Sequence, residues 1–169
     1  MSAADGTVGE ALTKLLDDAI PAERARKTSL EARSLAVITS SGVLVSLLFG
    51  LGAVVTKAND YRPPTGVLVL LIVAAATYTS AAVLAIAGNL PGRYYEIDAD
   101  SLAALASPEE WSQPGADAEQ QLALARLGLL TDWRRVNERK AYWLILAAAA
   151  ESAGILITTA ALIVILASA

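Results

Sequence analysis

The chain of 169 residues contains neither cysteine nor histidine. These two absences exclude thiol nucleophiles, disulfides, thiolate or imidazole metal sites and the commonest general base. Charged residues are scarce, at 18%, and aromatic residues make up only 5%. The sequence also lacks a glycine-rich phosphate loop and a credible pair of nucleophile and base. It therefore predicts no enzyme, no metal site and no cofactor.

What the chain does contain is three long apolar stretches, at residues 35–55, 66–90 and 141–167. Each is long enough for a helix to cross a bilayer core, which takes about 20 residues. Glu151 is their only charged residue, whereas a soluble helix of that length would carry a polar face. We therefore predict an all-α integral membrane protein with three transmembrane helices.

Lysine and arginine are distributed unevenly around these stretches. Five precede the first and six lie between the second and third, but only Lys57 and Arg62 separate the first two and none follows the third. Under the positive-inside rule, residues 1–34 and 91–140 should be cytoplasmic, while 56–65 form a short external loop and the C-terminus lies outside. The expected location is the inner (plasma) membrane. Because the first apolar run begins only at Leu35, we expect no cleaved leader.

The cytoplasmic segments should be helical. An apolar stripe precedes Pro21, which we expect to break the helix and to open a second one that runs into the membrane. We predict a short helix and a capped turn within 98–110, and one continuous helix from about Asp117 to Ala167. The cytoplasmic stripe of that helix, which needs a packing partner, should lie against Ala22 to Ser34 and comprise Leu122, Leu129, Trp133 and Val136.

Each apolar stretch carries a face of small residues, and such faces show where helices meet in lipid. The predicted packing glycines are Gly42, Gly50 and Gly154. The full faces are Thr39, Gly42, Ser46, Gly50 and Ala53 in the first stretch, Thr77, Ala81, Ala85 and Gly88 in the second, and Ala147, Glu151, Gly154, Thr158 and Ala161 in the third. Packing within one chain is the simpler interpretation, and contact between copies of a homo-oligomer is the alternative.

Glu151 is the most informative single residue, because it lies about 11 residues into the third stretch. A charge at that depth costs on the order of 2.5 to 3.5 kcal/mol, so the side chain should face protein or water. One interpretation is a protonated carboxyl that bonds to Thr39, Ser40, Ser41 or Ser46. The others are a ring of carboxylates lining a cation pore, with Thr158, Thr39 and Ser46 nearby, or a site for a proton or a substrate amine.

Two basic clusters flank the predicted inner face of the membrane. We expect them to bind anionic lipid headgroups, with a phosphorylated ligand as the less favoured alternative. Nucleic acid is not an expected partner, because residues 91–140 contain nine acidic and six basic residues and no aromatic stacking platform. The clusters are Arg24, Arg26, Lys27 and Arg33, and Arg134, Arg135, Arg139 and Lys140.

The order of these segments resembles a group of short bacterial membrane proteins. The segment Ala22 to Arg33 leads into Ala36-Val37-Ile38-Thr39-Ser40-Ser41-Gly42, two close-set spans follow, and a return helix carries Arg134, Asn137 and Lys140. In this architecture the chain is similar to the Pycsar-type and SLATT-type effectors of antiphage defence. The resemblance implies a homo-oligomer that compromises the inner membrane.

Two functions of different classes therefore remain. The first is a homo-oligomeric pore or ion channel. The second is a non-conducting scaffold or accessory subunit that recruits a partner through its cytoplasmic helices.

Overall fold

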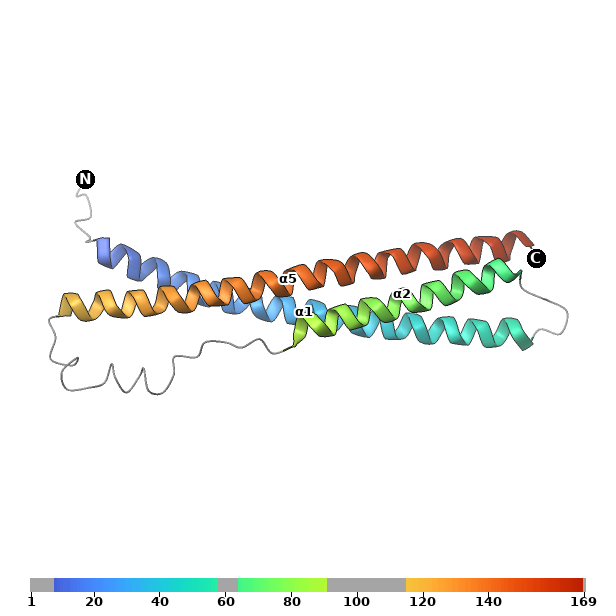
Figure 1. Cartoon of the computed structure of the whole chain (residues 1–169), viewed down its shortest axis with the longest axis horizontal. Helices are drawn as coiled ribbons and strands as arrows, with labels where there is room; N and C mark the ends of the chain where they lie inside the picture. The colour runs from blue at the N-terminus through green and yellow to red at the C-terminus, as the bar shows by residue number, and fades with distance from the viewer. Residues whose placement is uncertain (1–7, 58–63, 91–114, 169) are drawn as a thin grey trace. The chain divides into compact units, whose positions relative to one another are not determined.

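The computed structural model describes residues 8–57, 64–90 and 115–168. These residues form three helices, α1 (Val8–Lys57), α2 (Thr65–Asn89) and α5 (Gly115–Ser168), and contain no strand (Figure 1). All three helices are long and apolar enough to cross a membrane. The all-helical prediction is confirmed, and the three candidate spans fit a multi-pass membrane protein.

The contacts divide the chain into two compact units. Among the described residues, the first unit contains 8–29 and 115–138, and the second contains 30–57, 64–90 and 139–168. The second unit holds most of the apolar sequence. Predictions for the loop at 58–63 and for the short helix and turn within 98–110 lie outside the described residues.

The expected break at Pro21 is wrong, because α1 continues through this residue without interruption. Proline removes one backbone N–H and leaves the carbonyl oxygen four residues earlier without its helical donor. The side chain of Pro21 lies on an exposed face of the helix. Water can reach the carbonyl there, so one long helix survives the proline. Two other expectations agree with the structure: α2 ends at Asn89, and α5 is one continuous helix.

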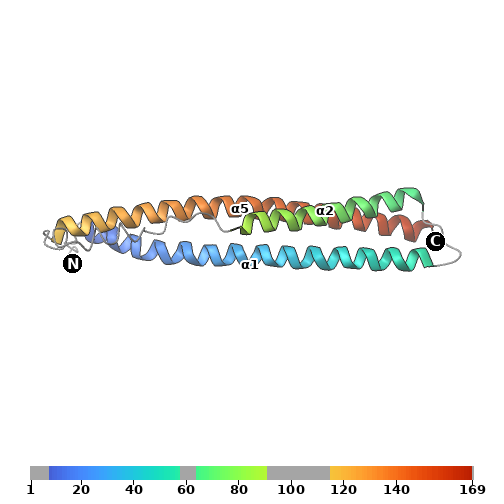
Figure 2. The same cartoon turned by 60° about the horizontal axis from the view of Figure 1, so that its bottom comes forward.

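In the second unit, α2 lies beside α1 and α5 (Figures 1 and 2). Helices α1 and α5 are parallel, since Glu31 contacts Lys140 and Ser40 contacts Glu151. The buried positions recur at intervals of three, four or seven residues on α2 and of seven residues on α5, which is the 3.5-residue spacing of left-handed helix packing. On α2 they are Val67, Ala74, Tyr78, Ala81, Ala85 and Gly88, and on α5 they are Lys140, Ala147, Gly154 and Ala161.

The first unit pairs the N-terminal part of α1 with α5, but the pairing begins earlier in α1 than the predicted partner segment Ala22 to Ser34, since Arg126 bonds to Asp17. Leu16 and Leu130 are buried at 1% and 2% exposure. The predicted stripe on α5 needs correction, because Leu122 is 45% exposed whereas Asn137 is buried. The predicted positions Leu122, Leu129 and Val136 repeat every seven residues. The actual seam has the same repeat but lies one residue later, at Leu130 and Asn137, because Asn137 is buried where it bonds to Glu23.

Candidate polar site among the apolar helices

A polar layer lies between two apolar layers of the second unit. One apolar layer groups Val37 with Ala81, Ala85 and Ala147. The other groups Leu48, Ala74 and Tyr78. The positions between them on α1 and α5 carry Ser40, Ser41, Glu151, Gly154 and Thr158.

Glu151 contacts α1 through its carboxyl group. Its Oε1 atom lies within hydrogen-bond distance of Ser40 Oγ, and both residues are partly buried. Ser40 was one of the four hydroxyl residues predicted as partners. Two of the others, Thr39 and Ser46, are exposed and donate to carbonyl oxygens of their own helix, at 2.9 Å each.

Ser41, the fourth, is buried at 1% exposure. Within the described part of the chain, its Oγ atom has no hydrogen-bond partner. An unpaired hydroxyl at such a position costs free energy. Ser41 is therefore the one buried side chain of this layer whose bonding the described helices do not complete.

Tyr78 supplies the α2 side of the layer. Its hydroxyl lies 3.2 Å from Thr158 Oγ1, and it is 1% exposed. Its ring packs on Gly154, where a Cβ atom would fall 2.7 Å from Tyr78 Cε1. Sequence reasoning missed this residue. The available signal was the spacing of Tyr78 between Ala74 and Ala81, which places it on the inner seam of α2.

The three small-residue faces have different surroundings. Those of α2 and α5 are buried or partly buried within the chain. The α1 face, which comprises Thr39, Gly42, Ser46, Gly50 and Ala53, is exposed along its whole length. No heavy atom outside the local helix lies within 4 Å of a Cβ placed on Gly42 or Gly50. The packing predicted for Gly154 thus occurs inside the chain, whereas no described residue packs on Gly42 or Gly50.

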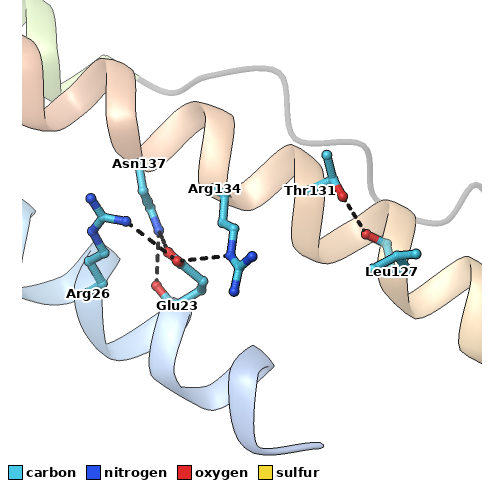
Figure 3. A network of polar contacts seen from close by, with 6 residues as sticks. All are labelled: Glu23, Arg26, Leu127, Thr131, Arg134 and Asn137. Atoms are coloured by element: carbon cyan, nitrogen blue, oxygen red, sulfur yellow. Dashed lines mark hydrogen bonds and ion pairs between the residues drawn. The ribbon is translucent and has the colours of Figure 1, made fainter. Parts of the chain in front are cut away.

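A second polar network lies in the first unit, around Glu23 (Figure 3). The Asn137 side-chain amide donates to the Glu23 carbonyl oxygen at 3.1 Å and to its Oε2 at 2.7 Å. Arg26 and Arg134 approach Oε1 of the same carboxylate, at 3.5 and 3.6 Å. Asn137 is 1% exposed, so this network joins α1 and α5 through buried hydrogen bonds.

The basic residues predicted to bind headgroups fall into two sets. Several are engaged inside the chain: Arg26 and Arg134 with Glu23, Arg24 over the Trp133 ring at 5.0 Å, Lys140 with Glu31 at 2.6 Å, and Lys27 at a partly buried position. Arg33, Arg135 and Arg139 are exposed. For these three, headgroup binding stays a prediction, and it would break no ion pair seen among the described residues.

The polar layer has the chemistry of a proton donor and acceptor site. It combines one carboxyl group with hydroxyl groups from three helices. In the described ranges, no group of three acidic side chains is arranged to hold a metal ion. Comparisons with protein-family models, with curated proteins and with solved structures found no match to this chain.

Proposed function

We propose that the chain is a subunit of a homo-oligomeric membrane protein, that copies meet along the α1 face, and that the assembly conducts ions. One observation carries this proposal. The α1 face is exposed, whereas the matching faces of α2 and α5 are used within the chain.

The physical support comes from how helices associate in lipid. Apolar side chains gain little by leaving a lipid environment, so association depends on close backbone approach at small residues. Gly42 and Gly50 offer open space for such an approach. The hydroxyls of Thr39 and Ser46 already bond within the helix, so they need no other polar partner. A second copy of α1 presents the same small surface and is the occupant we propose.

Conduction follows if several copies close into a ring through this face and leave an opening at the axis of the ring. The resemblance to antiphage effectors also supports conduction by a homo-oligomer. It extends the proposal to depolarisation of a bacterial inner membrane. Glu151 is not part of the proposed interface between copies, because its hydrogen bond to Ser40 lies within one chain. That contact supports the buried-acid interpretation more than a carboxylate ring.

The interface is tested by placing larger side chains on the α1 face. The double variant Gly42→Leu, Ser46→Leu should shift the protein toward monomer in native mass measurement in mild detergent, since larger side chains hold the backbones apart. The change spares the bundle, because both positions are exposed. Ala149→Leu is the matched control, as it adds the same side chain to an exposed position of α5. Equal masses for the double variant and the control would remove the basis of the interface.

Conduction is tested separately, by ion flux through purified protein in liposomes. The wild type and Ala149→Leu should conduct, and the double variant should lose most of the flux together with its assembly. An assembled wild type with flux no greater than that of empty liposomes would instead establish a non-conducting role.

A separate observation favours the scaffold alternative. Several leucines of the first unit, outside the longest apolar stretches, are exposed. They are Leu12, Leu15, Leu122, Leu124 and Leu127, at 41% to 61% exposure. Exposed apolar surface of this kind marks contact sites when it is contiguous. A scaffold would use these leucines to bind a partner, and the liposome measurement separates it from a channel.

A further inference from the structure

We infer that Glu151 is a proton-binding site, in which the carboxyl group carries a proton and donates it to Ser40 Oγ in a hydrogen bond between α5 and α1. The inference concerns contacts within one chain. It therefore stands apart from the proposals that copies assemble and that the assembly conducts.

The first step is the direction in which hydroxyl groups donate in these helices. In the apolar segments, nine serine and threonine hydroxyls lie 2.7 to 2.9 Å from the carbonyl oxygen four residues earlier. They are Thr39, Ser40, Ser46, Thr77, Thr79, Ser80, Ser152, Thr158 and Thr159. Donation to this carbonyl is a common arrangement for serine and threonine within helices. It satisfies the hydroxyl hydrogen without water.

The second step counts hydrogens at Ser40. Its Oγ lies 2.8 Å from the Ala36 carbonyl oxygen and 3.2 Å from that of Val37, and it also contacts Glu151 Oε1. A hydroxyl has one hydrogen to donate and two lone pairs to accept with. If the hydrogen goes to Ala36, as at the other eight positions, Ser40 Oγ is an acceptor toward Glu151. The carboxyl group must then be the donor, and only a protonated carboxyl can donate.

The same arrangement recurs on the other side of the polar layer. Thr158 Oγ1 lies 2.9 Å from the Gly154 carbonyl oxygen and 3.2 Å from the Tyr78 hydroxyl. With the Thr158 hydrogen on the carbonyl, Tyr78 donates to Thr158. Both bonds between helices thus run from an acidic O–H group to a hydroxyl that bonds back to its own helix.

The charges around Glu151 agree with a neutral acid. The groups in this layer are Ser40 and Ser41 on α1 and Tyr78 on α2, none of them a cation. On α5 the preceding basic residue is Lys140, roughly 16 Å away along the helix axis, and Lys140 is paired with Glu31. Among the residues that the structure describes, an ionised carboxylate at this position would therefore have no counter-charge between apolar helices, which is unfavourable.

Infrared difference spectroscopy tests the inference in liposomes. Exposed carboxyl groups are ionised at about pH 7, so a carbonyl stretching band of a protonated acid would come from a shielded group. The wild-type spectrum minus that of Glu151→Gln should contain this band. Glu138→Gln is the matched control, because Glu138 is an exposed acid of the same helix. Its difference spectrum should contain ionised carboxylate bands only.

Ser40→Ala tests the partner. Without the hydroxyl acceptor, the protonated-acid band should persist and move to higher frequency. Carboxylate bands in place of the protonated-acid band for Glu151 would overturn the inference. A protonated-acid band that Ser40→Ala leaves unmoved would overturn the assigned hydrogen bond. Neither outcome depends on subunit number or on ion flux, so each is distinguishable from failure of the proposed function.

Discussion

At the scale of single residues, the surroundings of the glycines decide what a substitution does. Gly154 lies against the Tyr78 ring and Gly88 against Trp143 Cβ, where an added Cβ would fall at 2.7 and 2.8 Å. Gly42, Gly50 and Gly128 have open space at the same position. The same replacement is therefore expected to have opposite effects in the two groups.

Gly154→Ala should lower the free energy of unfolding by about 1 to 3 kcal/mol, because the new methyl group overpacks the contact with Tyr78. Gly128→Ala on the same helix should be neutral or slightly stabilising, since alanine favours helix more than glycine does. Thermal unfolding in detergent, followed by circular dichroism, measures both. Equal midpoints for the two variants would contradict the close packing of α2 on α5.

The candidate site could be predicted from the sequence only in part. Glu151 stood out as a charge in an apolar stretch, and Ser40 was among its four predicted partners. Tyr78 did not stand out, because its partner Thr158 lies 80 residues further along the chain. Asn137 and Glu23 were missed as a pair for the same reason, being 114 residues apart. Local periodicity identifies the inner face of a helix but leaves its neighbour undetermined.

At the scale of elements, helix lengths and ends followed from the sequence wherever apolar composition and breakers agreed. The end of α2 at Asn89 and the continuity of α5 are examples. Pro21 was different, because the cost of a proline depends on whether solvent reaches the carbonyl that it leaves free. That exposure is a property of the packed pair of helices, and it cannot be read from neighbouring residues.

Replacing this proline tests the continuity of α1. Pro21→Ala restores the missing N–H donor and should raise the stability of the first unit, by up to about 3 kcal/mol. The side chain is exposed, so little packing is lost. Ala22→Gly, at the adjacent exposed position, should act in the opposite direction. Protection of the backbone amides around Asp17 from hydrogen exchange reports both effects. Unchanged protection in Pro21→Ala would indicate that α1 is interrupted there.

At the scale of the whole molecule, three candidate spans and the distribution of basic residues lead to one predicted topology. An odd number of crossings places the two termini on opposite sides of the membrane. The excess of lysine and arginine before the first span and between the second and third predicts that the N-terminus and residues 91–140 lie inside.

Reporter fusions check this topology. A reporter that is active only outside the cytoplasm should work when fused after Ala169 and fail when fused before Met1. Fusion of a reporter that is active only in the cytoplasm should give the reverse pattern. Cytoplasmic activity at both termini would mean that one of the three helices, α5 in the first place, does not cross the membrane.

The parallel pairing of α1 with α5 has a consequence for biosynthesis. Residues that meet across this pair are 109 to 114 positions apart in the chain. A ribosome takes roughly 5 to 20 seconds to add that many residues. During this interval α1 and α2 can form their antiparallel hairpin, but Glu23 and Ser40 lack their partners on α5. Docking of α5 therefore follows formation of this hairpin, and until it occurs the seam that receives α5 stays unfilled.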